Sequence, residues 1–227
     1  MAPRVLLFDI DGTLVLSGGA GLRAMNRAFE ELFAVPDAFS GVAMPGRTDA
    51  VILADAAAAH GVPPADLERF PDVYVAHLAA EIEKPGPRKG VMPGVRELLD
   101  ALAPRGEAYL ALLTGNYERA ARLKLEYFDL WRYFRCGAFG DGAANRNHLF
   151  PRALARVQDQ GGPVVPASDV VVIGDTPLDV ECAAAAGARS VAVATGAYDT
   201  AALSASGADV VFEDLTDTAT VLAALGL

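Results

Sequence analysis

Polar residues that can bind metal or transfer protons follow three apolar stretches of this sequence. The stretches read VLLFDIDGT, ALLTGN and VVIGDTPLD, and each carries two such residues: Asp9 and Asp11, Thr114 and Asn116, and Asp175 and Asp179. Carboxylates two residues apart repel each other and contribute little to a hydrophobic core. The first pair therefore indicates a site that needs its charge.

A cluster of carboxylates and hydroxyls of this kind needs a cation. Oxygen ligands suit Mg²⁺, which binds proteins through one or two carboxylates and keeps several waters. The histidines, His60, His77 and His148, are scattered along the chain, which argues against a zinc site. We therefore expect Mg²⁺ as the cofactor. The ion would also supply the local positive charge that an acidic chain lacks for a phosphate ester.

The spacing of the first pair is compatible with two roles at one phosphoryl group. An aspartate at the end of a strand can attack phosphorus and form an aspartyl-phosphate, as Asp9 would. A second carboxylate, Asp11, could protonate the leaving alkoxide and later deprotonate the hydrolytic water. Ile10 points its side chain the opposite way, so both carboxylates can reach the site. Gly12 would let the chain turn sharply away.

Short β-rich runs alternate with helical patterns over most of the chain. The pattern predicts strands at 5–8, 109–114, 170–173, 190–193 and 209–212, and helices at 117–128, 151–160, 177–186 and 200–205. Apolar strands that alternate with helices are typical of a parallel sheet covered on both faces. We therefore predict an α/β fold with a doubly wound, Rossmann-like parallel sheet. Ligands of such sheets bind at the carboxyl ends of the strands, where the six polar residues would meet.

One long segment interrupts the alternation. Between residues 8 and 109 the sequence carries amphipathic helical patterns, namely GLRAMNRAFEELF, GRTDAVILADAAAAHG and PPADLERFPDVYVAHLAAEIEK, and little strand signal. Glycine-rich flanks precede and follow this block, as expected of hinges. We predict a helical cap domain at 17–87, inserted into a core domain formed by 1–16 and 88–227.

Composition limits the classes of partner. The chain has 227 residues, 52% of them hydrophobic, and a formal net charge of −10, which argues against nucleic acid and anionic membranes. It has no apolar run long enough to span a membrane and no signal peptide. Cys136 and Cys182 suit buried thiols in a reducing cytoplasm. We expect a cytoplasmic monomer or homodimer that acts on a small phosphomonoester.

The motifs DIDGTL, LLTGN and VIGDTPLD resemble the haloacid dehalogenase-like hydrolase superfamily. The closest resemblance is to its phosphatase branch with an α-helical cap inserted after the first motif, which includes phosphoglycolate phosphatase-like enzymes. The resemblance implies Asp9 as nucleophile, Asp11 as general acid–base and Thr114 as a donor to the phosphoryl oxygens. It also implies Mg²⁺ held by Asp9, the backbone carbonyl of Asp11 and Asp175, with Asp179 supporting the site.

The family also has a basic residue, usually Lys, upstream of the last motif, where it neutralises charge between nucleophile and phosphate. This chain departs from that pattern because the region holds no Lys. Arg146 is the preferred candidate, with Arg152 behind it, whereas Lys124 lies farther upstream in the preceding helix. Asn116 is expected near the phosphate or the cap. Arg47, in MPGRTDAVIL, is a candidate for binding a substrate carboxylate or second phosphate.

Two alternatives remain open at this point. A phosphomutase of the β-phosphoglucomutase type would carry nearly the same motifs but return the phosphoryl group to a sugar. A signalling module would hold a phosphorylated aspartate for a partner to read, as response-regulator receivers do. Those receivers lack a helical insertion of this size, which favours the phosphatase.

Overall fold

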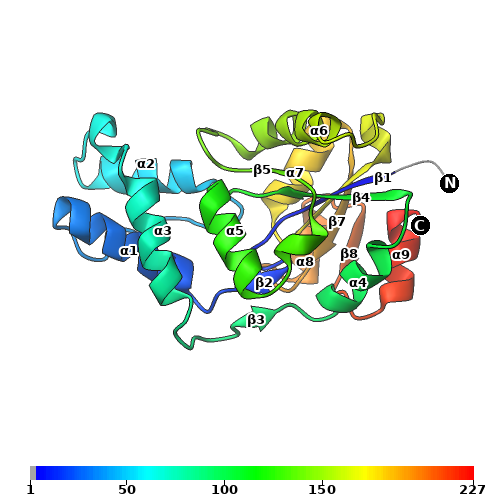
Figure 1. The fold of residues 1–227 in the computed structure, drawn as a ribbon, viewed down its shortest axis with the longest axis horizontal. Helices are drawn as coiled ribbons and strands as arrows, with labels where there is room; N and C mark the ends of the chain where they lie inside the picture. The colour runs from blue at the N-terminus through cyan, green and yellow to red at the C-terminus, as the bar shows by residue number, and fades with distance from the viewer. Residues whose placement is uncertain (1–3) are drawn as a thin grey trace.

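A six-stranded sheet lies at the centre of the molecule. The computed structural model describes residues 4–227, and all neighbouring strands of this sheet run parallel (Figure 1). In spatial order the strands are β5 (Gly137–Ala138), β4 (Ala108–Leu113), β1 (Arg4–Phe8), β6 (Val170–Gly174), β7 (Arg189–Val193) and β8 (Val210–Phe212). The chain begins in the middle and builds the sheet outward on both sides, so the predicted doubly wound fold is confirmed.

The strand sequences explain the central place of the sheet. β1 and β6 are runs of Val, Leu, Ile and Phe, and nearly all of their residues are buried. Such runs are typical of parallel strands covered on both faces. Alternate residues of a strand point to opposite faces. In β1, Leu6 and Phe8 accordingly join one hydrophobic cluster, whereas Val5 and Leu7 join another.

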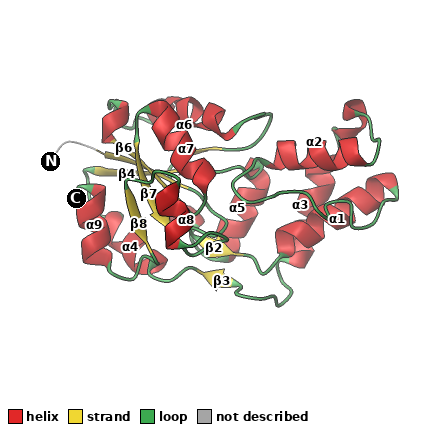
Figure 2. Cartoon of the chain, turned by 180° about the vertical axis from the view of Figure 1, so that it is seen from behind, coloured by secondary structure: helices red, strands yellow, loops and turns green. Residues whose placement is uncertain are grey.

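Helices cover both faces of the sheet (Figures 1 and 2). The cluster around Phe8 contains residues of α4 (Val95–Leu102), α5 (Glu118–Tyr127) and α9 (Thr218–Leu225). The cluster around Leu7 contains residues of α6 (Leu149–Asp159) and α7 (Pro177–Ala186). α8 (Thr200–Ala205) packs near β7 and β8. Four short 3₁₀ helices complete the described residues: Pro64–Leu67, Trp131–Tyr133, Arg146–His148 and Ala167–Asp169.

Three helices between β2 and β3 form what we call the helical insertion: α1 (Ala20–Phe33), α2 (Asp49–Ala59) and α3 (Phe70–Glu81). They pack around their own aromatic cluster, in which Phe29 makes edge contacts with Phe39 and Phe70. The buried carboxylate of Glu81 pairs with basic side chains of α1, including Arg23. The same cluster includes Tyr117 and Ala120 near the start of α5, so the insertion packs on this helix beside the sheet.

The chain leaves and re-enters the sheet region at neighbouring points. β2 (Val15–Leu16) pairs antiparallel with β3 (Gly90–Val91). Next to this pair, the backbones of Gly18 and Gly86 approach so closely that a Cβ on Gly86 would lie 2.1 Å from the Gly18 carbonyl oxygen. Glycine is therefore required at this crossing. The domain boundaries proposed from the sequence, at 17 and 87, stay a prediction.

Sequence and structure differ mainly at short elements. Each of the five predicted strands lies within one residue of its observed bounds, whereas α4, α9 and the two-residue strands were not anticipated. α2 begins at Asp49 rather than at Gly46, because Thr48 is its N-cap. In residues 4–227, no helix combines the length and apolar character that crossing a membrane requires.

Candidate active site

The strand-end residues meet at one edge of the sheet. Asp9, Thr114 and Asp175 each follow the last residues of β1, β4 and β6, and β1 lies between the other two strands. The register aligns Phe8 with Leu112 on one side and with Ile173 on the other. The carboxyl ends of these parallel strands therefore place the polar residues side by side, as the sequence predicted.

Three carboxylates form the innermost part of the site. Asp9, Asp175 and Asp179 are buried, and each offers an oxygen within 4.8 Å of the others. Burial, followed by the neighbouring charges of Asp9 and Asp179, raises the pKa of Asp175 well above its usual value. Burial likewise raises the pKa of Asp179 to about 6, although Arg146 opposes the shift. The cluster is therefore short of positive charge.

This donor set fits the Mg²⁺ ion that the sequence predicted. Carboxylate oxygens are hard ligands of the kind Mg²⁺ prefers. The backbone also encloses Asp175, since a Cβ built on Gly196 would lie 1.7 Å from Asp175 Oδ2 and one on Gly12 2.3 Å from it. Thr13 Oγ1 donates to the other oxygen at 3.1 Å. Asp175 is thus held in one orientation at the edge of the cluster.

Asp179 is held by the start of α7. Thr176 donates to Asp179 Oδ2 from its backbone nitrogen at 3.1 Å and from its hydroxyl at 2.7 Å. The reciprocal bonds form a capping box at the N-terminus of the helix. The spacing of Thr176 and Asp179 in GDTPLD is therefore explained by the helix start, and the second oxygen of Asp179 remains directed at the cluster.

Arg146 is the cation of the cluster. It lies in the 3₁₀ helix after β5, and its Nη2 is 3.2 Å from Asp9 Oδ1 and 2.5 Å from Asp179 Oδ1. Burial disfavours its charge, but the attraction of Asp179 and Asp9 outweighs burial and raises its pKa. Arg152, the second candidate from the sequence, is exposed and donates instead to the carbonyl of Asp141.

Arg146 also reaches the helical insertion. Its Nη1 donates to the carbonyl of Gly46 at 3.1 Å, and its Nη2 donates to the carbonyl of Leu113 at 3.1 Å. The planar guanidinium can serve several acceptors at fixed angles, which an ammonium group cannot do. One side chain therefore joins the buried carboxylates, strand β4 and the loop before α2.

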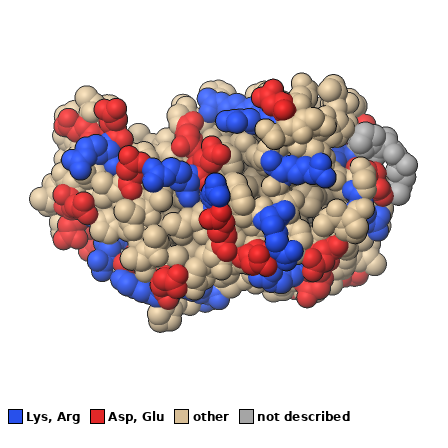
Figure 3. Space-filling model, viewed as in Figure 1, with Lys and Arg blue, Asp and Glu red and all other residues tan. Residues whose placement is uncertain are grey.

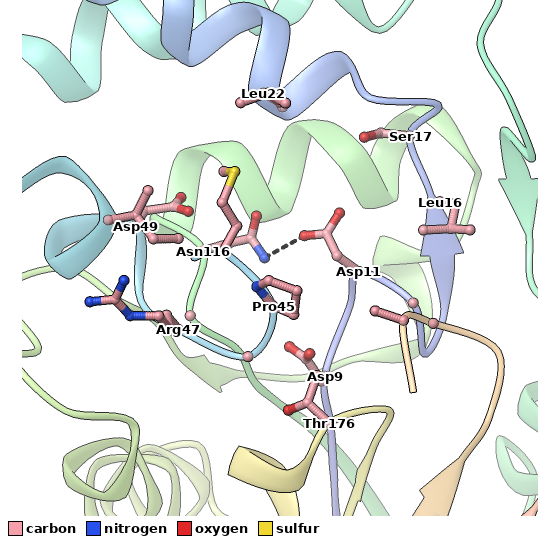
Figure 4. Close-up of a pocket in the computed structure, with 18 of the residues that line it drawn as sticks. Asp9, Asp11, Leu16, Ser17, Leu22, Pro45, Arg47, Asp49, Asn116 and Thr176 are labelled. Atoms are coloured by element: carbon pink, nitrogen blue, oxygen red, sulfur yellow. Dashed lines mark hydrogen bonds between the residues drawn. The ribbon is translucent and has the colours of Figure 1, made fainter. Parts of the chain in front are cut away.

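Asp11 faces away from the buried carboxylates. Its side chain is 39% exposed, and its Oδ2 accepts hydrogen bonds from Asn116 Nδ2 at 2.8 Å (Figure 4) and from Lys124 Nζ at 2.6 Å. Asn116 Nδ2 also donates to Thr114 Oγ1 at 2.8 Å. The side chain of Asp11 is thereby oriented by two residues from the other side of the site.

Lys124 lies in the site, although Arg146 was preferred to it as the basic residue predicted from the sequence. Its Nζ also donates to Asn116 Oδ1 at 2.6 Å, and its side chain is buried. The sequence holds a signal for it, because Ala120, Ala121 and Leu125 form the apolar stripe of α5 and Lys124 lies on that stripe. A lysine on a buried helix face needs a partner, and here the partner is Asp11.

The loop before α2 is docked on the sheet edge. Thr48 Oγ1 donates to the carbonyl of Ala143 at 2.8 Å, and the backbone nitrogen of Asp49 donates to the carbonyl of Gly115 at 2.7 Å. Arg47, a candidate for substrate binding, pairs with Asp55 at 2.6 Å (Nη2 to Oδ2). Its guanidinium points away from Asp9 and Asp11 (Figure 4).

A cavity of about 460 Å³ lies between the sheet edge and the helical insertion. The sheet-edge residues on its wall are Asp9, Asp11, Gly12, Gly115, Asn116, Lys124, Arg146, Asp175, Thr176, Gly196 and Ala197. The insertion adds a mostly apolar wall that includes Leu22, Met25 and Ile52. Its size is that of a site for an organic small molecule. On the face shown in Figure 3, acidic and basic side chains are intermixed.

Comparisons with known proteins agree with this geometry. A family model described as haloacid dehalogenase-like hydrolase matches residues 3–187. A phosphoglycolate phosphatase from Rhodospirillum rubrum is 34% identical over an alignment of 225 residues, and the match covers 93% of this chain and 88% of that protein. A hydrolase from Pseudomonas syringae has the same fold (TM-score 0.72, 22% identity, 98% of this chain and 99% of that chain). A candidate β-phosphoglucomutase from Thermotoga maritima is 25% identical (TM-score 0.64, 98% and 99% covered).

Proposed function

Because the chain belongs to the haloacid dehalogenase-like hydrolases, we propose that it is a Mg²⁺-dependent phosphatase of small phosphorylated metabolites. The resemblance inferred from its three motifs is confirmed. The proposed substrate is a phosphomonoester similar to phosphoglycolate or a sugar phosphate, and the proposed intermediate is an aspartyl-phosphate. The observation that carries the proposal is the cluster of Asp9, Asp175 and Asp179 around Arg146, on the wall of a cavity.

Asp9 is the proposed nucleophile. It is buried at the end of β1, and Arg146 holds its Oδ1, so a carboxylate oxygen keeps a fixed position against an incoming phosphoryl group. Attack forms the bond between this oxygen and phosphorus and breaks the bond between phosphorus and the ester oxygen. Arg146 opposes the negative charge that builds up as the phosphoryl group approaches the carboxylate.

Asp11 is the proposed general acid–base. Asn116 and Lys124 orient its Oδ2 at the cavity wall, where the leaving group departs. In the first step Asp11 gives its proton to the leaving alkoxide, and in the second it takes a proton from the water that attacks phosphorus. Thr114 Oγ1 accepts a hydrogen bond from Asn116, so its own proton can be donated to a phosphoryl oxygen.

Asp9, Asp175 and the backbone carbonyl of Asp11 are the proposed ligands of Mg²⁺, with Asp179 supporting them. Bound Mg²⁺ would neutralise phosphoryl charge and orient the phosphate for attack. Asn116, and Arg47 after it turns from Asp55, are proposed to bind the substrate. Residues 17–87 would act as a cap over the site. We further propose a cytoplasmic location and a monomeric or homodimeric state.

Phosphate release from p-nitrophenyl phosphate tests the function. We expect turnover with Mg²⁺, its loss with EDTA, and recovery when Mg²⁺ is returned. Asp9→Asn should be inactive while remaining folded by circular dichroism. Turnover that persists in Asp9→Asn would contradict the proposed nucleophile. Turnover that EDTA does not reduce would contradict the proposed metal dependence. A stable phosphoprotein without turnover would instead indicate a signalling module.

A phosphomutase is the second candidate. It is favoured by the likeness to the candidate β-phosphoglucomutase from Thermotoga maritima, at 25% identity over nearly the whole chain. Incubation with a hexose 1-phosphate and Mg²⁺ separates the two reactions. Hexose 6-phosphate as product indicates the mutase, whereas hexose and inorganic phosphate indicate the phosphatase.

A further inference from the structure

We propose that the substrate's leaving group is a neutral alcohol with a further hydroxyl group, and that Asp49 on the helical insertion binds this hydroxyl. The inference rests on the proposed phosphatase function and narrows its substrate class. It distinguishes a polyol or sugar phosphate from the phosphate ester of a hydroxy acid.

Asp49 offers one unused oxygen to the cavity. It is the first residue of α2, only 7% of it is exposed, and it lines the cavity. Its Oδ2 accepts a hydrogen bond from the backbone nitrogen of Tyr117 at 2.9 Å. Among residues 4–227 its Oδ1 has no hydrogen-bond donor, and the carboxylate points into the cavity, toward Asn116 (Figure 4). An acceptor that faces the cavity from a largely buried side chain is suited to a donor on the ligand.

Asp49 disfavours a carboxylate on the same ligand. Burial raises the pKa of Asp49 to about 7, with the charge of Lys124 opposing the shift. Above this pKa Asp49 is charged, and it would repel a carboxylate on the ligand. A hydroxyl group instead donates a hydrogen bond to Asp49 without adding charge.

Most of the cations on the cavity wall are already engaged by carboxylates of the protein. The cations on this wall are Arg47, Arg88, Lys124 and Arg146. Three of them are already paired with carboxylates, since Arg47 contacts Asp55, Lys124 contacts Asp11 and Arg146 contacts Asp9. The fourth, Arg88, is exposed and donates to the carbonyl of Thr195. The nearness of Lys124 to Asp49 also disfavours an ammonium group on the ligand.

Most other side chains of the insertion on the cavity wall are apolar, so they suit hydrocarbon groups of the ligand better than charged groups. Leu22, Met25, Met44, Pro45 and Ile52 line this part of the cavity. A volume of about 460 Å³ is within the range of sites that enclose whole organic ligands, so a two-carbon acid would leave much of it empty. A leaving group of three or more carbons would pack its C–H groups against this apolar wall and place a hydroxyl group within reach of Asp49.

Matched pairs of substrates test the inference. Glycerol 3-phosphate is compared with 3-phosphoglycerate, and erythritol 4-phosphate with 4-phosphoerythronate, so that each pair differs in one terminal group. We expect kcat/KM for the alcohol to exceed that for the acid by about tenfold or more in the longer pair. Asp49→Asn, which keeps an acceptor for Tyr117, should lower this ratio by about tenfold.

Controls separate binding from folding. Asp66→Asn removes the same charge from an exposed position of the insertion and should leave the ratio unchanged. A merely structural role of Asp49 would lower kcat/KM equally for both members of a pair, and an unchanged ratio in Asp49→Asn would overturn the inference. A wild-type preference for both acids would also overturn it, and would point to Arg88 as their receptor.

Failure of the inference and failure of the proposed function give different results. p-Nitrophenyl phosphate is measured alongside the pairs. If it is hydrolysed while the acids are preferred, only the substrate class is wrong. If no compound in the set releases phosphate, the phosphatase function and the inference are both wrong.

Discussion

The two walls of the cavity are built on different principles. On the sheet edge, charged residues crowd together, and each is fixed by the end of a buried strand or the start of a helix, as Asp9 and Asp179 are. On the insertion wall of the cavity, apolar side chains predominate, and Asp49 is the buried carboxylate that lies among them. The first wall carries the side chains that we propose for phosphoryl transfer. The second can vary with the substrate, because none of the proposed catalytic side chains belongs to it.

The largest expected effect comes from the sheet edge. Asp9→Asn should lower kcat for p-nitrophenyl phosphate by on the order of 10⁴-fold or more, because the amide cannot attack phosphorus. Steady-state kinetics with Mg²⁺ measure the loss. Asp49→Asn on the opposite wall should change kcat far less than it changes the preference among substrates. Equal losses of kcat in the two variants would contradict the proposal that the two walls have different functions.

Removing the cation of the cluster should cost stability. Arg146→Met leaves three buried carboxylates without their counter-charge and should lower the free energy of unfolding by about 3–5 kcal/mol. Urea unfolding in EDTA measures the change. Arg152→Met removes the same charge from an exposed neighbour and should stay within about 0.5 kcal/mol of the wild type. A similarly small effect in Arg146→Met would mean that the cluster does not depend on its arginine.

Stability without metal should fall as the pH rises. The pKa values of Asp179 and Asp49, about 6 and about 7, lie above the usual value of 3.8. The folded protein therefore binds more protons than the unfolded chain between about pH 4 and 7, so its free energy of unfolding decreases through this window. In EDTA, Tm at pH 8 should lie several degrees below Tm at pH 5, at roughly 2–4 °C for each kcal/mol.

Adding Mg²⁺ and replacing Asp49 should affect the pH dependence of Tm in different ways, because they act on different walls of the cavity. Mg²⁺ at pH 8 should restore Tm through the sheet-edge carboxylates. Asp49→Asn should reduce the fall in Tm near the upper pH limit of this range, without altering the increase in Tm that Mg²⁺ causes. A Tm independent of pH in EDTA would contradict the raised pKa values on both walls.

The smallest expected effect concerns Arg47. Arg47→Ala should raise KM for the best substrate by roughly two- to fivefold and leave kcat nearly unchanged, because a partly exposed charge contributes little to binding. Asp55→Asn serves as the matched variant, since it releases Arg47 from its ion pair and should lower KM. If Arg47→Ala leaves KM unchanged for every substrate, Arg47 does not bind the substrate.

The sheet could be predicted because its longer strands are recognisable in the sequence as apolar runs. VLLF and VVVIG are unbroken apolar runs, and the polar residues after them had to meet at the carboxyl edge once the strands were parallel. β5, with only Gly137 and Ala138, has no such pattern and exists because it pairs with β4. The helix α4 was missed because its start follows directly on a segment rich in Gly and Pro.

The site was harder to predict where long side chains cross between elements. Lys124 follows Asp9 by more than a hundred residues and belongs to a helix, and only the packing of α5 brings its Nζ to Asp11. Arg146 was selected from the sequence by its place relative to the last motif, but its bond to Gly46 depends on where the insertion docks. Asp49 carried no sequence signal, because an acidic residue at a helix start is ordinary.

Two nitrogens of the Arg146 guanidinium connect Asp9, the proposed nucleophile, to the loop before α2. One nitrogen holds Asp9 and Asp179, and the other holds the carbonyl of Gly46. Any displacement of this loop would remove an acceptor from the same guanidinium that contacts Asp9. The orientation of the arginine beside Asp9 therefore depends on where the insertion docks, so a substitution that displaces this loop would be felt at the sheet edge.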